Sequence, residues 1–84
     1  MTKTIKLLKE IFQTFDLGLA GALISIGYQL LDLNKSNPRK VQFIFPESNE
    51  IYKAVEDYWS GNLQVDARTY FDSIRMLKNH LYSD

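Results

Sequence analysis

Side chains that commonly carry out covalent chemistry are scarce in this sequence. Its 84 residues contain no cysteine and a single histidine, His80, close to the C-terminal end. A thiolate or multi-histidine zinc site is therefore excluded, and no serine is linked to a histidine base by a known motif. A lone histidine near a helix end usually serves as a favourable partner of the helix dipole. We predict that the protein is not an enzyme and has no catalytic residue, cofactor or metal.

A cluster of basic residues is better suited to binding. The stretch KSNPRKVQFIF begins at Lys35 and places Arg39 and Lys40 directly before an alternating apolar run. The Asn, Ser and Pro residues between them predict a turn, so the three cations would lie at the tip of a hairpin. A basic hairpin can hold a phosphate backbone, and each such contact adds a salt-dependent increment. The alternative is that the charges only keep the hairpin end solvated.

Two further binding candidates lie on predicted helices. Arg68, Arg75 and Lys78 would form the outer face of the last helix, where Asp72 is spaced to pair with both arginines. Tyr52 falls outside the apolar stripe of its own helix, so its ring would be available to a partner. The predicted binding residues are Lys35, Arg39, Lys40, Arg68 and Tyr52.

A helix rich in small residues is expected before the hairpin. Thr14 or Asp16 can cap its start, and Gly27 is suited to the position just after its end. Gly18 and Gly21 lie inside it, where each glycine costs roughly 1 kcal/mol relative to alanine. This composition predicts that a neighbouring element approaches the helix closely.

The hairpin itself is predicted from two β-forming runs. Residues 28–33 and 41–45 would pair in an antiparallel fashion, with residues 34–40 as the turn. Val41, Phe43 and Phe45 share one face. Because two strands are not stable alone, we expect the first and last helices to cover this face.

Two more helices complete the predicted fold. Ser48 can cap a helix over residues 49–60 that Gly61 ends, and Asp66 can cap the last helix. The sequence therefore predicts a single α+β domain over residues 14–84, in the order helix–strand–strand–helix–helix. Residues 1–13 would form an N-terminal arm, helical or extended, that could support self-association.

Charge and hydropathy set limits on location and partners. Ten Lys and Arg residues balance ten Asp and Glu residues, which argues against a strongly basic nucleic-acid binder but permits a local patch. The longest uncharged stretch, residues 17–31, is shorter than the roughly 18–20 residues of a membrane span. With no cysteine and no signal-peptide pattern, we expect a cytoplasmic protein that does not enter the membrane.

Several phrases resemble a family of small bacterial and phage proteins catalogued as a domain of unknown function. The resemblance covers about Thr14 to Leu81, and its most specific motif is the last one, V-D-A-R-x-[YF]-F. The matching residues are Thr14, Asp16 and Leu17; Gly27 and Tyr28; Phe43 and Phe45; Tyr58 and Trp59; and Val65, Asp66, Ala67, Arg68, Tyr70 and Phe71. The resemblance implies a phage or mobile-element context, but no activity and no functional residue.

Two functions are compatible with these features. The first is a non-enzymatic accessory module that docks onto nucleic acid or a nucleoprotein assembly through the basic hairpin tip. The second is a protein-binding inhibitor or regulator from a phage or mobile element, of the counter-defence type, without nucleic-acid affinity of its own. The zero net charge and the spare aromatic residues suit the second as well as the first.

Overall fold

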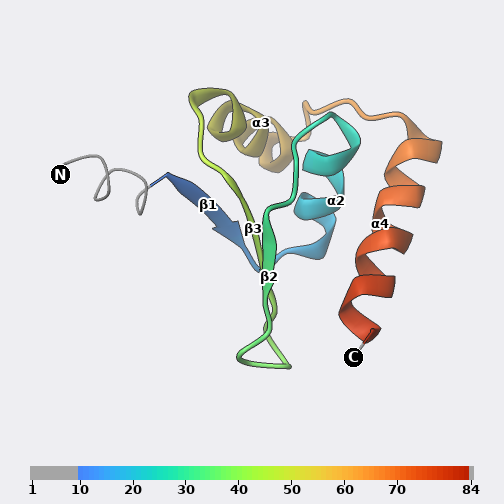
Figure 1. The fold of residues 1–84 in the computed structure, drawn as a ribbon. Helices are drawn as coiled ribbons and strands as arrows, with labels where there is room; N and C mark the ends of the chain where they lie inside the picture. The colour runs from blue at the N-terminus through green and yellow to red at the C-terminus, as the bar shows by residue number, and fades with distance from the viewer. Residues whose placement is uncertain (1–9, 84) are drawn as a thin grey trace, which may run out of the picture.

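The computed structural model describes residues 10–83 as three helices and a three-stranded antiparallel sheet (Figure 1). The elements are β1 (Ile11–Thr14), α2 (Leu17–Ser25), β2 (Asp32–Asn34), β3 (Gln42–Pro46), α3 (Asn49–Ser60) and α4 (Ala67–Tyr82). The predicted α+β class and the order helix–strand–strand–helix–helix are confirmed, with one strand added before the first helix. None of the helices in residues 10–83 has both the length and the apolar character needed to cross a membrane.

The strand β1 is the main difference from the sequence prediction. The predicted arm over residues 1–13 overlaps this strand, which pairs with β3 so that Phe12 lies opposite Phe45. The Phe12 ring also packs edge-on against Tyr52, with 5.7 Å between ring centroids. These distant partners decide the conformation of a stretch whose own residues suit helix and strand equally. The rest of the predicted arm, residues 1–9, lies outside the described residues. Its predicted role in self-association is therefore not tested by the structure.

The first hairpin strand is shorter and later than predicted. The turn that follows α2 holds Tyr28, whose N–H donates to the Leu23 carbonyl at 2.9 Å, and hydrogen bonding to β3 starts at Leu31, whose N–H donates to the Ile44 carbonyl at 2.7 Å. Gly27 has a φ of +113°, a left-handed conformation that L-residues with side chains rarely adopt. β2 then pairs with β3 so that Leu33 lies opposite Phe43. The central strand of the sheet is β3, with β1 and β2 on either side.

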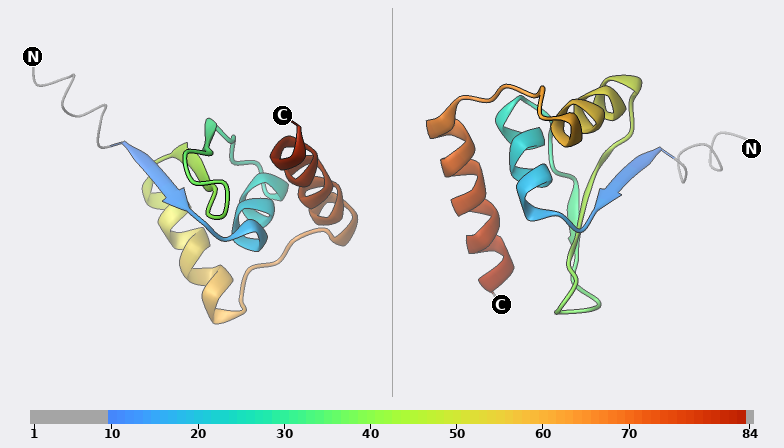
Figure 2. Two further views of the ribbon diagram at one scale, coloured as in Figure 1. Left: turned by 90° about the horizontal axis from the view of Figure 1, so that it is seen from below. Right: turned by 180° about the vertical axis from the view of Figure 1, so that it is seen from behind.

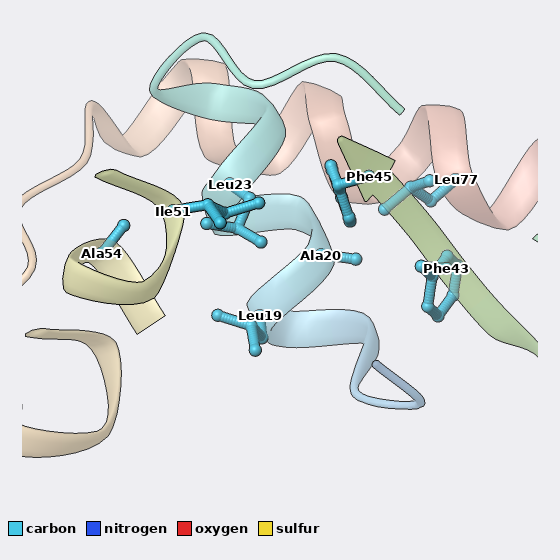
Figure 3. Close-up of a cluster of buried hydrophobic side chains, with 8 residues drawn as sticks. All are labelled: Leu19, Ala20, Leu23, Phe43, Phe45, Ile51, Ala54 and Leu77. Atoms are coloured by element: carbon cyan, nitrogen blue, oxygen red, sulfur yellow. The ribbon is translucent and has the colours of Figure 1, made fainter. Parts of the chain in front are cut away.

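The core lies between one face of the sheet and the helices. Phe43 and Phe45 are 2% and 0% exposed, and they pack near Leu77 of α4 (Figure 3). The other members of the buried cluster are Leu19, Ala20, Leu23, Ile51 and Ala54. The predicted apolar face is confirmed for Phe43 and Phe45, and α3 helps α2 and α4 to cover it. Val41, at the edge of this face, is half-buried.

The predicted close approach to the glycine-rich helix is also confirmed. A Cβ atom on Gly21 would lie 3.0 Å from Cγ1 of Ile74 on α4, and closer still to Cδ1 of the same side chain. The Tyr70 hydroxyl of α4 donates to the Gly18 carbonyl at 3.3 Å. The missing side chain of Gly21 therefore lets α4 pack directly on α2, whereas Gly18 leaves room for the Tyr58 hydroxyl of α3, which would lie 2.7 Å from an added Cβ atom. The helix α2 stands between α3 and α4 (Figure 2).

Candidate binding groove at the hairpin tip

The tip, residues 35–40, is folded by its own polar side chains. The Asn34 Oδ1 atom accepts hydrogen bonds from the Ser36 N–H at 3.0 Å and from its hydroxyl at 2.8 Å. The Asn37 Oδ1 atom accepts from the Arg39 N–H at 3.0 Å, and the Lys40 N–H donates to the Asn37 carbonyl at 3.0 Å. Such local bonds are typical of Asn and Ser in turns. Because these Asn and Ser groups are engaged in bonds within the loop, the cations are the tip residues best suited to contact a ligand.

Lys35 fastens the tip to the end of α4. Its Nζ atom donates to the carbonyls of His80 at 2.8 Å and Ser83 at 3.4 Å. Carbonyls at a helix C-terminus lack helical partners and carry partial negative charge, which makes them good acceptors for a lysine. Lys35 thus brings together two segments that are distant in the sequence, and its ammonium group faces α4.

An open groove lies between the tip and the end of α4. Its volume is about 380 Å³. The residues that line it are Phe15, Leu17, Pro38, Arg39, Val41, Phe43, Leu81 and Tyr82. Most of these residues are apolar or aromatic, and Arg39 is the only charged side chain that residues 10–83 contribute to the lining. We call this hollow the tip groove.

Two cations and two aromatic rings stand at the rim of the tip groove. Lys40 places its Nζ atom 5.1 Å from the ring centroid of Phe15, a cation–π arrangement. The exposed fraction is 53% for Phe15 and 82% for Tyr82. Within residues 10–83, neither Arg39 nor Lys40 forms an ion pair with a carboxylate. The rim therefore offers positive charge and flat apolar surface to a ligand.

The sequence identified the cations of this site but not its walls. Phe15 lies between β1 and α2, and Leu81 and Tyr82 end the last helix, so nothing in their spacing connects them with residues 35–40. The packing of α4 against α2, together with the bonds from Lys35 to the end of α4, brings the C-terminal turn to the hairpin. One signal for Phe15 was present in the sequence. This large apolar residue precedes the helix cap Asp16, so it cannot belong to the apolar face of the helix and needs another role.

Tyr52 does not belong to this site. It lies on α3, whereas the tip lies at the opposite end of the hairpin (Figure 1). As predicted the residue is exposed, but its hydroxyl donates to the Glu47 carboxylate at 2.6 Å and its ring contacts Phe12. The hydrogen bond to Glu47 raises the pKa of the Tyr52 hydroxyl above its ordinary value. This ring is held by its own neighbours rather than presented beside the tip.

Arg68 is also separate from the tip. It lies in the first turn of α4, with the length of the helix between it and the groove. The expected intrahelical pair is present, since the Arg68 Nε atom is 3.7 Å from Oδ2 of Asp72. Both side chains are largely exposed, and such pairs contribute little to stability. Arg75 makes a different contact, with its guanidinium 5.7 Å from the ring centroid of Phe71.

Comparison with known families decides the classification of the chain. The model of a family described as a domain of unknown function, DUF5659, matches residues 9–83. The chain belongs to this family. No curated protein and no solved structure matches it.

The family match confirms the resemblance seen in the sequence and extends it. The resemblance was expected over about Thr14 to Leu81, whereas the match begins at residue 9 and therefore includes β1. Every residue that lines the tip groove lies inside the matched range. The family description names no activity, and the tip groove is the feature of the fold that bears on function.

A second hollow, of about 520 Å³, lies between the end of α2 and α4. It is lined by Ile24, Gly27, Tyr28, Gln29, Leu30, Met76 and His80. Among residues 10–83, the lining contains no carboxylate, lysine or arginine. None of the lining residues is therefore a charged partner for His80. Within residues 10–83, no group of three or more His, Cys, Asp and Glu side chains is arranged to hold a metal ion. The tip groove is the better candidate for a binding site.

Proposed function

We propose that the protein is a small, non-enzymatic binding module that docks onto nucleic acid or a nucleoprotein assembly through the tip groove. The observation that supports this proposal is the pairing of Arg39 and Lys40 with exposed aromatic rings at one rim. Cations without carboxylate partners can contact phosphates, and nearby rings can contact bases or sugars. We expect the module to act in the cytoplasm of a bacterial host or of a phage-infected cell.

Substitution of the rim cations tests the proposal. Arg39→Gln and Lys40→Gln should each weaken oligonucleotide binding and lower the slope of log affinity against log salt by roughly 0.7 to 0.9, one phosphate contact each. Lys35 is left unchanged because it holds the end of α4. Fluorescence anisotropy with a labelled oligonucleotide, over a range of salt concentrations, measures both quantities.

The matched control is Lys53→Gln, which removes one exposed cation from α3, away from the tip (Figure 1). It should leave affinity and salt slope almost unchanged. If the double variant Arg39→Gln/Lys40→Gln binds as tightly as the parent at every salt concentration, the tip serves only to keep the hairpin solvated.

A second candidate function is supported by the apolar lining of the groove. Seven of the eight lining residues are apolar or aromatic, which also suits an apolar anchor from a protein partner. We therefore keep the protein-binding regulator of a phage or mobile element as the alternative. Capture from host lysate, repeated after nuclease treatment, separates the two: partners lost with nuclease support docking onto nucleic acid, and partners that persist support the regulator.

A further inference from the structure

The outer face of α4 carries a row of basic and aromatic residues. Arg68, Phe71, Arg75, Lys78 and Tyr82 are spaced alternately by three and four positions, so they form one stripe along the helix. All five are exposed. The buried residues of the helix, Ser73 and Leu77, belong to the opposite face. We call this stripe the α4 strip.

The contacts within α4 leave the side chains of the α4 strip exposed to solvent. Arg75 lies over the Phe71 ring rather than beside Asp72, and Phe71 is 57% exposed. In residues 10–83, Asp72 pairs with Arg68 alone, and that pair is exposed and 3.7 Å long. These contacts engage Arg68, Phe71 and Arg75 but leave them exposed, so the rings and cations remain accessible to a ligand.

The α4 strip leads into the tip groove. Its last residue, Tyr82, is one of the groove lining residues, and Lys35 ties the adjacent turn of α4 to the tip. From Arg68 to Tyr82 the helix rises roughly 20 Å, at about 1.5 Å per residue. Together the strip and the rim of the groove make one surface in which each exposed ring follows one or two cations: Arg68, Phe71, Arg75, Lys78, Tyr82, Arg39, Lys40 and Phe15.

We infer that this continuous surface binds single-stranded nucleic acid, with phosphates on the cations and unpaired bases on the rings. This inference rests on the proposed function and names the form of its ligand. Rings can stack on unpaired bases, whereas the bases of a duplex are already stacked on each other. Rings interspersed among cations suit a single strand, in which bases that can stack lie between charged phosphates. The phosphates of a duplex could contact the cations, but its stacked bases would not contact the rings.

The experiment compares single-stranded and duplex oligonucleotides of the same sequence by fluorescence anisotropy at one salt concentration. The parent protein should bind the single strand more tightly. Phe71→Ala and Tyr82→Ala should each weaken single-strand binding by roughly fivefold or more, the effect of losing one stacked base, with duplex binding changed by less than about twofold. The matched control is Trp59→Ala, which removes another exposed ring, on α3, and should leave both affinities unchanged. Circular dichroism checks that each variant keeps the parent helix content.

Three other results would contradict the inference. If the oligonucleotides bind and depend on Arg39 and Lys40, but single strand and duplex bind alike and both ring variants match the parent, the inference is wrong and the proposed function stands. If neither oligonucleotide binds, both are wrong. If a polyglutamate peptide binds in their place with the same dependence on Phe71 and Tyr82, the surface is a docking site for an acidic protein segment and the inference is overturned.

Discussion

At the scale of single residues, the three cations of the tip have different roles although they look alike in the sequence. Lys35 is bound to carbonyls at the end of α4, Lys40 stands over the Phe15 ring, and Arg39 lines the groove. Their partners are distant along the chain, so spacing alone could not separate these roles. The residue-level predictions that held concern local physics instead: Asp16, Ser48 and Asp66 each cap a helix, as a side-chain oxygen next to free N–H groups requires.

The cap of α4 gives a pH-dependent prediction. Hydrogen bonds from Thr69, first from its backbone N–H and then from its hydroxyl, lower the pKa of the Asp66 carboxyl below its ordinary value of 3.8. Because the folded pKa lies below the unfolded one, this carboxylate stabilises the fold above the unfolded pKa and ceases to do so as the pH falls through the folded pKa. Asp66→Asn keeps a capping oxygen that does not titrate. The free energy of unfolding of the parent should therefore fall relative to this variant below about pH 4.

Urea denaturation between about pH 5 and pH 2.5 measures the difference between the two proteins. Asp72→Asn is the control, because it removes one carboxylate from the same helix without touching the cap. If the difference between the parent and the Asp66→Asn variant stays constant over this range, the cap carboxylate has the same pKa in the folded and unfolded chains.

At the scale of elements, most of the fold was predictable and one strand was not. Helices α2, α3 and α4 carry local signals in their caps and in Gly27 and Gly61, which have φ values of +113° and +81°. β1 has no such signal, since its conformation depends on pairing with β3 some thirty residues later in the chain. The residues that line the sides of the tip groove could not be predicted for the same reason, because they come together only when α4 packs on α2.

The packing of α4 on α2 can be tested at Gly21. Alanine there would gain about 1 kcal/mol of helix propensity, but its Cβ atom would overlap the Ile74 side chain, and overpacking typically costs about 1–3 kcal/mol. We expect the overlap to dominate, because Cγ1 of a β-branched residue cannot move aside without a change of rotamer. Gly21→Ala should lower the free energy of unfolding by roughly 1 kcal/mol in urea denaturation.

A double-mutant cycle identifies the cause. Ile74→Val removes the Cδ1 atom that lies nearest to the added Cβ, and Ile→Val alone costs about 0.5–1.5 kcal/mol. The cost of Gly21→Ala should be smaller in the Ile74→Val background than in the parent. Stabilisation by Gly21→Ala in the parent would mean that the two helices have room for a methyl group, contrary to their predicted close packing.

At the scale of the whole molecule, the zero net charge conceals a separation of charge. The segment from residue 47 to residue 57, which contains most of α3, carries Glu47, Glu50, Glu56 and Asp57 against Lys53 alone. The tip and α4 carry six cations against Asp72: Lys35, Arg39, Lys40, Arg68, Arg75 and Lys78. Because α2 stands between α3 and α4 (Figure 2), the two groups of charge lie on different sides of the fold. A balanced composition therefore does not argue against a polyanionic partner for one side.

This separation predicts how the protein behaves on a cation-exchange resin. At pH 7 and low salt the parent should be retained although its formal net charge is +0, because one side presents a positive field to the sulfonate groups within the Debye length of about 10 Å or more. Lys78→Gln and Lys53→Gln change the net charge equally, but only Lys78 lies on the basic side. Lys78→Gln should thus elute at clearly lower salt than the parent, and Lys53→Gln close to it. Equal shifts for the two variants would show that retention depends on net charge alone. The separation of charge would then not explain attraction of a polyanion to the basic side.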